Sequence, residues 1–190
     1  MSTLKVNSII PVAGVPTGGG GGIVQVQNTT IKTKSSLSLT QHSFNHYSGL
    51  DVSLTPKSNT SKILISGACF GEGSNNDTQY AFKIMRSIGG GSNADIDCTG
   101  TASGNRPGTL GAFMTPYFAA DNDSTETVAS WANVLDSPAT TSAITYKFMI
   151  YAVDSGSTFT FNATNSDSNG VDYARGVSYM TIMEVSAWVH

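Results

Sequence analysis

The sequence predicts an all-β fold, a two-sheet sandwich of jelly-roll type preceded by an extended N-terminal arm. The 190 residues include 25 Ser, 22 Thr and 13 Asn but only three Glu, a composition typical of strands and turns. Short segments of alternating apolar and polar residues recur about every ten residues from Ile23 onward. About ten strands in one chain of this length fit two packed sheets.

Residues 1–22 differ from the rest and are predicted to form the arm, with the sandwich domain occupying 23–190. Five consecutive glycines, 18–22, have high chain entropy, so we expect the arm to be ordered only against another surface. The alternatives are strand addition to a neighbouring subunit or partner, and folding back onto its own domain. The candidate anchors of the arm are Leu4, Val6, Ile9, Ile10 and Pro11.

The strands are expected in the following order along the chain. The first half contains 23–33, a short and weakly patterned segment at 38–44, then 49–55, 62–71 and 78–86. Residues 110–118 are ambiguous between strand and helix, and we interpret them as extended because of Gly111 and Pro116. The second half contains 126–135, 144–153, 158–162 and 177–187.

The segment 144–153 is predicted to be the central strand, because apolar residues occupy both of its alternating faces. We predict that it forms a hairpin with 126–135, since Asp136, Ser137 and Pro138 provide a tight polar connection. Everything else can be arranged as strands around this pair.

The charge balance excludes some classes of partner. The net charge is −3, the isoelectric point is near 5.4 and charged residues make up 12% of the chain. No basic run is present, which argues against nucleic acid. No stretch approaches the roughly 18 apolar residues of a membrane helix, and we expect no membrane insertion and no secretory signal.

The residues that could carry chemistry do not form a known catalytic pattern. Cys69 and Cys98 are predicted to be buried free thiols, since they lack the spacing of a zinc site. His42 and His46 have the spacing of metal ligands on a helix, but the surrounding pattern is that of strands. Asp121, Asp123 and Glu126 lack the further ligands of a calcium loop, so a polar turn is expected there. We therefore predict no enzyme activity, no cofactor and no metal.

Three blocks of the sequence are informative when taken together: Ser2-Thr-Leu-Lys-Val-Asn-Ser-Ile-Ile-Pro11, Leu50-x-Val-x-Leu-Thr-Pro-Lys-Ser-x-Thr-Ser-Lys-Ile-Leu-Ile65, and the closing pair 135–147 and 175–184. They resemble blocks of the β-rich tail-fibre and other virion proteins of marine and cyanobacterial bacteriophages. The resemblance implies a virion structural protein, often a homotrimer, assembled in the host cytoplasm and exposed on the particle surface. It carries no catalytic residues. The chain has no coiled-coil or shaft repeats, which favours a fibre tip or short appendage over a complete long fibre.

The resemblance leads to two hypotheses. In the first, the chain is a tail fibre, fibre tip or short appendage whose arm docks to other virion proteins and whose loops attach to the host. In the second, it is a capsid decoration, cement or head-fibre knob protein that binds no receptor. An enzyme acting on surface polysaccharide would need paired carboxylates in a cleft, and the scarcity of Glu argues against it.

The candidate contact residues follow from the first hypothesis. If a host receptor is bound, a surface glycan is expected, held by the polar loops 89–107 and 163–175. The alternative is that these loops are only solvated surface or subunit contacts. Candidate receptor-facing residues are Asp95, Asp97, Arg106, Tyr173 and Arg175. Candidate trimer contacts on the second face of the central strand are Met149, Tyr151 and Val153.

Overall fold

The computed structural model describes residues 22–75, 80–113, 126–171 and 173–186. Within these ranges every regular element is a β-strand. The strands are β1 (Ile23–Ile31), β2 (Ser35–Ser38), β3 (Phe44–Leu54), β4 (Lys62–Gly73), β5 (Tyr80–Ile88), β6 (Asn93–Asp95), β7 (Gly111–Ala112), β8 (Thr127–Asp136), β9 (Ile144–Ala152), β10 (Thr158–Phe161) and β11 (Ser178–Val185).

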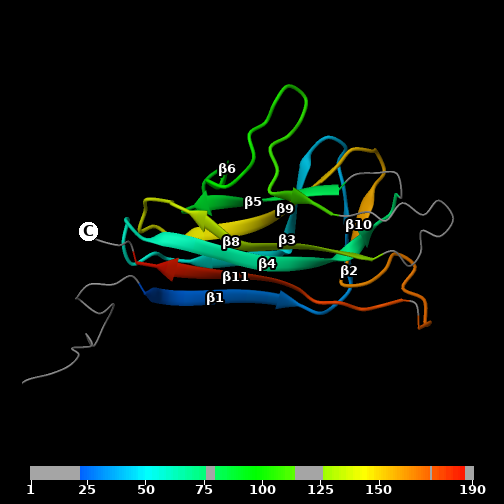
Figure 1. The fold of residues 1–190 in the computed structure, drawn as a ribbon. Helices are drawn as coiled ribbons and strands as arrows, with labels where there is room; N and C mark the ends of the chain where they lie inside the picture. Colours follow the sequence, from blue (N-terminus) through cyan, green and yellow to red (C-terminus); the bar gives the residue numbers. More distant parts are fainter. Residues whose placement is uncertain (1–21, 76–79, 114–125, 172, 187–190) are drawn as a thin grey trace, which may run out of the picture.

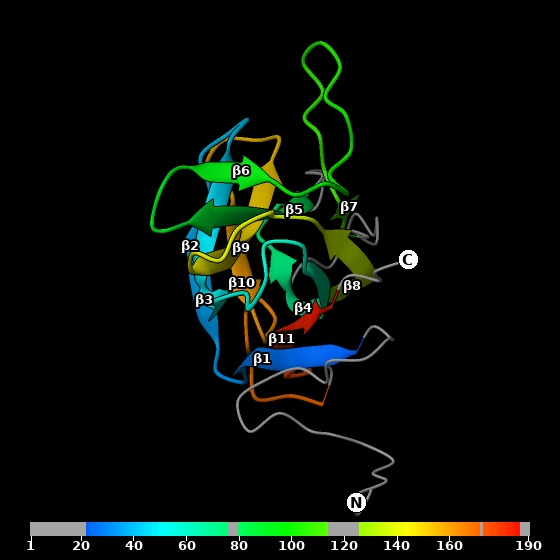
Figure 2. The ribbon, with the colours of Figure 1, turned by 90° about the vertical axis from the view of Figure 1, so that its left-hand side faces the viewer.

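The strands form two antiparallel sheets that pack face to face (Figures 1 and 2). Sheet A has the order β1-β11-β4-β10-β2, with β8 pairing along the other edge of β4. Sheet B has the order β3-β9-β5-β6, with β7 also pairing with β5. The prediction of a two-sheet sandwich is confirmed.

The path of the chain alternates between the sheets. After β2 of sheet A, the chain enters sheet B at β3 and returns to sheet A at β4. It then forms β5, β6 and β7 in sheet B, β8 in sheet A, β9 in sheet B and β10 in sheet A. This repeated crossing is the winding of a jelly roll. It also shows that the predicted hairpin is wrong, because β8 pairs with β4 and β9 pairs with β3 and β5. Residues 137–143 carry the chain from one sheet to the other.

Two other segments differ from the prediction. The segment expected at 38–44 is the connection between β2 and β3, and β3 itself starts at Phe44 and includes the segment predicted to begin at Gly49. The polar loop predicted at 89–107 contains β6, and β7 follows it. The remainder of the predicted strand 110–118 lies outside the described residues from Met114 onward, as do Asp121 and Asp123.

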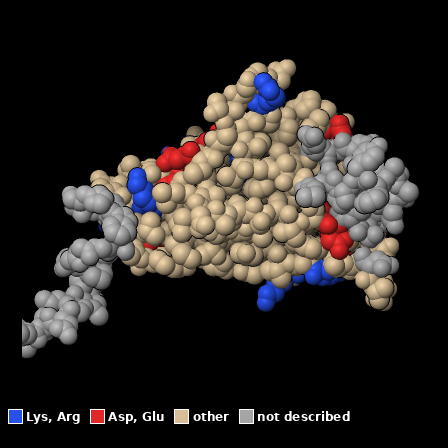
Figure 3. All heavy atoms as spheres, in the orientation of Figure 1, with Lys and Arg blue, Asp and Glu red and all other residues tan. Residues whose placement is uncertain are grey.

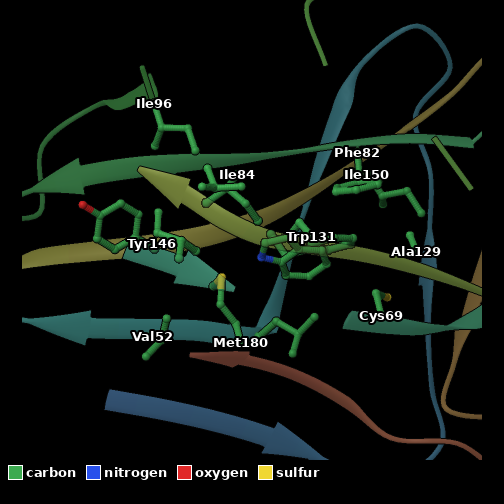
Figure 4. Packing of buried hydrophobic residues seen from close by; sticks show 14 of the residues in the cluster. Val52, Cys69, Phe82, Ile84, Ile96, Ala129, Trp131, Tyr146, Ile150 and Met180 are labelled. Carbon is green, nitrogen blue, oxygen red and sulfur yellow. The ribbon is translucent and has the colours of Figure 1, made fainter. Parts of the chain in front are cut away.

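The central position of β9 is confirmed. It lies between β3 and β5, and Ile144, Tyr146, Phe148 and Ile150 are fully buried. Phe148 stacks with Phe82 and Trp131, at ring-centroid distances of 5.7 and 5.5 Å. Trp131 comes from β8 of the opposite sheet, so this stack fills the space between the sheets (Figure 4). Aromatic contacts of this kind add to the stabilisation from apolar burial.

A buried ion pair connects the two sheets where β8 ends. Asp136 is fully buried and forms a salt bridge with Arg86 of β5. Its Oδ2 accepts a hydrogen bond of 2.9 Å from the hydroxyl of Tyr146 on β9. Burial, and then the neighbouring Asp136 carboxylate, raise the pKa of Tyr146, so this hydroxyl keeps its proton and donates. Asp97 completes the cluster, with Oδ1 3.6 Å from Arg86 Nη1.

Candidate functional site

A groove of about 840 Å³ lies on the outer face of sheet B, between the sheet and the loop 96–110. This loop connects β6 to β7 and projects from the body of the molecule (Figures 1 and 2). Residues of β3, β5, β7 and β9 form one side of the groove, and residues 102–109 of the loop form the other. Clefts of this size are the usual sites of small-ligand binding.

The floor of the groove is a single row of residues across four strands. Phe44 pairs with Tyr151, Tyr151 with Ala81, and Ala81 with Ala112. Residues opposite one another in a sheet point to the same face, so all four side chains face outward. The two rings therefore stand beside two alanines, and the difference in side-chain size produces the hollow.

The aromatic side of the groove is held in place by a lysine on the same outer face of sheet B. The rings of Phe44 and Tyr151 are 5.2 Å apart at their centroids and tilted by 48°. Lys83 Nζ lies 4.2 Å from the centre of the Phe44 ring and 2.6 Å from Asp95 Oδ1. This cation–π contact and ion pair restrict the Phe44 ring. The groove thus presents a rigid aromatic surface without a free lysine beside it.

The loop side of the groove carries an arginine at a tight turn. Ser103 and Arg106 exchange two backbone hydrogen bonds of 3.0 and 3.1 Å, and Gly104 adopts a φ of 59° that the turn requires. Ser103 also accepts from the guanidinium, at 3.2 Å from Nε to its carbonyl and 3.1 Å from Nη2 to its Oγ. Arg106 is therefore positioned by its own turn and lines the groove together with Asn105.

Two of the predicted receptor-facing residues are engaged within the protein. Asp95 pairs with Lys83, as described above, and Asp97 contacts Arg86 and accepts from the Ser137 backbone N–H at 3.0 Å. Both carboxylates are about half exposed. They stabilise the start of the projecting loop, and neither lines the groove.

The other two predicted receptor-facing residues lie far from Arg106. Arg175 binds Asp167 through two hydrogen bonds of 2.8 and 2.6 Å, and Tyr173 packs against Gly170. This second loop lies on the opposite side of the molecule from the projecting loop in both views (Figures 1 and 2). The structure therefore separates the predicted candidates into two surfaces, and the groove lies at that of Arg106.

The candidate trimer contacts fall into two groups. Met149 is only 5% exposed, so it is already covered within one chain. Tyr151 and Val153 both line the groove. The sequence placed these two together with Met149 on one face of the central strand, as candidate trimer contacts. It could not assign the groove, because the pairing of Tyr151 with Ala81, and of Ala81 with Ala112, depends on the sheet register.

The described residues contain no group of three or more His, Cys, Asp or Glu side chains that could hold a metal ion. His42 lines the groove, whereas His46 contacts Asp51 with 2.7 Å between Nε2 and Oδ1. Both cysteines are free, as predicted, but only Cys69 is buried and Cys98 is exposed. Burial raises the pKa of the Cys69 thiol, which makes it unreactive.

The sequence matches no model of a known protein family and no curated protein. The described part of the chain contains no helix long and apolar enough to cross a membrane. The groove and the two outer faces are therefore the structural basis for assigning a function.

Proposed function

We propose that the chain is a structural subunit of a bacteriophage particle, of the tail-fibre tip or short-appendage type, and that its groove binds a glycan of the host surface. The observation that carries the proposal is the row of Phe44, Tyr151, Ala81 and Ala112 beside Arg106. The apolar faces of sugar rings stack on aromatic side chains, and their hydroxyl groups accept hydrogen bonds from donors such as Arg and Asn.

The groove fits a saccharide better than a purely apolar ligand. Its aromatic surface is only half-buried, and polar side chains from the projecting loop face it across the hollow. It is also open, which suits a segment of a longer polymer. The guanidinium of Arg106 would favour a glycan that carries carboxylate or phosphate groups.

The arm is proposed to attach the subunit to other virion proteins. Its anchors Leu4, Val6, Ile9, Ile10 and Pro11 lie outside the described residues, so this role rests on the sequence. The described chain begins at Gly22, which exchanges hydrogen bonds with Ser186 at 3.0 and 2.9 Å. An Ile9→Asp, Ile10→Asp variant should fold normally and fail to enter particles, and normal incorporation would contradict the docking role.

Binding to immobilised bacterial lipopolysaccharides and capsular polysaccharides, followed by saturation-transfer NMR on a hit, tests the groove. Tyr151→Ala should weaken binding about tenfold or more, because one stacked ring contributes on the order of 1–2 kcal/mol. Tyr173→Ala is the matched control, since Tyr173 belongs to the other predicted loop. Binding that is insensitive to Tyr151→Ala, or that is lost only with Tyr173→Ala, would contradict the proposal.

Copy number separates this proposal from a capsid decoration role. Quantitative mass spectrometry of purified particles should find a handful to a few dozen copies for a tail appendage. Hundreds of copies would favour a decoration or cement protein, and the groove would then need another explanation.

A further inference from the structure

The outer face of sheet A carries an apolar row that crosses four strands. Val26 of β1 pairs with Met183 of β11, Met183 with Leu64 of β4, and Leu64 with Leu135 of β8. These paired residues share one face of the sheet. Val26 and Leu135 are 47% and 41% exposed, so the row is open to solvent at both ends.

A second apolar group lies at the other end of the same face. It comprises Val128, Val177 and Tyr179, all more than 40% exposed. Between the two groups, Asn28 donates to Thr181 Oγ1 at 2.8 Å and accepts from Thr30 at 2.7 Å. These polar groups are already bonded to one another, which lowers the cost of removing them from water.

Charge is almost absent from this face. The strands β1, β4, β8 and β11, all of whose residues the structure describes, contain Lys62, Glu72, Asp136 and Glu184. The three acidic residues are buried, which leaves Lys62 at one margin, where it donates to Ser137 Oγ at 2.7 Å. Figure 3 shows this face over β8, β4 and β11 without charged side chains across its middle. Sheet B differs, since Lys83, Lys147 and the His46–Asp51 pair lie on its outer side.

We propose that the outer face of sheet A is a self-association surface, covered by the same face of another copy of this chain. An uncharged face meets its own copy without repulsion, whereas a charged partner would find no complement on it. Four strands spaced about 4.8 Å apart and about 30 Å long present roughly 570 Å² per copy, or about 1,100 Å² for two copies. This area exceeds the roughly 1,000 Å² expected of a specific interface.

Face-to-face packing of sheets is also an established geometry, with strand directions about 30° apart. Two copies facing one another, or three copies around an axis, would both bury the apolar row, and the mass of the assembly distinguishes these arrangements. The groove on sheet B stays open in either case.

The test is sedimentation velocity and light scattering of the full chain between about 1 and 100 μM. We expect the wild-type protein to form dimers or trimers of the 19.8 kDa chain. A Val26→Lys, Leu135→Lys variant should weaken association at least 100-fold, because two unpaired charges would enter the interface. Val153→Lys is the matched control: this valine is 39% exposed on the other sheet, and its replacement should leave the assembly intact.

Hydroxyl-radical footprinting of the wild-type protein gives a readout that needs no variant. Oxidation of Met183 and Tyr179 should fall as the concentration rises, while oxidation of Tyr151 should not. A wild-type chain that is monomeric at 100 μM, or a double variant that is folded and still associates, would overturn the proposal. So would loss of association in Val153→Lys with protection of Tyr151, which would place the interface on sheet B.

The arm is the other possible occupant of this face, and it is distinguished by the Ile9→Asp, Ile10→Asp variant. If the full chain is monomeric and this variant associates, the arm covers the face and the proposal fails. If this variant alone loses association, the arm makes the contact and the proposal fails as well. Unchanged association of the arm variant supports contact between the sheets.

Discussion

Asp136 should be the most sensitive single charged position for stability, because it is fully buried and contacts both sheets. Its carboxylate forms a salt bridge with Arg86, accepts from the Tyr146 hydroxyl at 2.9 Å, and lies 3.3 Å from the backbone N–H of Asp97. Replacement by Asn keeps the size of the side chain, removes its charge and turns one of its two acceptor oxygens into an NH2 donor. Any loss of stability then reports the ion pair and its hydrogen bonds, and not a cavity.

The expected loss of unfolding free energy depends on the contacts that remain around Arg86 or Asp136 after its partner is replaced. Removing one member of a buried pair costs about 3–5 kcal/mol. After Asp136→Asn, Arg86 keeps the Asp97 carboxylate at 3.6 Å and is 18% exposed, so we expect the lower end, about 3 kcal/mol. Arg86→Met leaves the fully buried carboxyl of Asp136 without its cation, so we expect about 5 kcal/mol. The order of the two variants is therefore predicted as well as their size.

Equilibrium urea unfolding measures both effects. With a denaturant slope of about 2–3 kcal/mol per M, Asp136→Asn should lower the midpoint by about 1 M or more. The Arg86→Met, Asp136→Asn double variant should lose less stability than the sum of the losses in the two single variants. The reason is that Asp136→Asn removes the carboxyl that Arg86→Met leaves without its cation. A loss below about 1 kcal/mol for Asp136→Asn, or a smaller loss for Arg86→Met, would refute the reasoning.

Three further predictions concern single positions. Gly67→Ala should destabilise the fold by about 1–3 kcal/mol, because a Cβ there would lie 2.4 Å from the Trp131 ring, and thermal unfolding measures the loss. A maleimide should label Cys98 in the native protein and Cys69 only after unfolding, as counted by mass spectrometry. Partial desolvation opposes ionisation of Asp167, but hydrogen bonds from Arg175 and Lys34 outweigh it and lower its pKa. The stability that these hydrogen bonds contribute is present above the ordinary carboxylate pKa of about 4. It is lost as the pH falls through the lowered pKa of Asp167 in the folded protein. The protection of amides in 163–171, relative to their intrinsic exchange rate at each pH, should therefore fall in acid, and Asp167→Asn should remove that dependence.

The fold class could be predicted because local patterns determine it. Alternation marks β4, β8, β9 and β11 within a few residues of their observed limits, and the two apolar faces of β9 indicate its central place. The pairing of strands could not be predicted in the same way. The sequence of a polar connection such as 137–143 is similar in a hairpin and in a crossing between two sheets. Only long-range packing determines which of these two connections forms.

The candidate site was predictable only in part, for the same reason. Arg106 and Tyr151 were both named from the sequence, Arg106 as a candidate receptor-facing residue and Tyr151 as a candidate trimer contact. Nothing in their spacing brings them to one groove, because that depends on the register of β5 against β9 and β7. The role of Asp136 was also missed: its position before Ser137 and Pro138 is typical of a turn, and its burial arises from Arg86, fifty residues away in the chain.

The few charged residues are distributed unevenly between the outer faces of the two sheets. If charge were merely sparse, both outer faces would be equally depleted, yet sheet B carries ion pairs and sheet A carries almost none.

The groove and the proposed self-association surface lie on different sheets, so assembly would present several grooves on one particle. Linked weak sites can raise overall binding by a factor of about 10²–10⁴. The Val26→Lys, Leu135→Lys variant should therefore bind a short glycan with unchanged affinity in NMR and lose binding to a polysaccharide-coated surface. A parallel loss in both assays would show that the two faces are not independent.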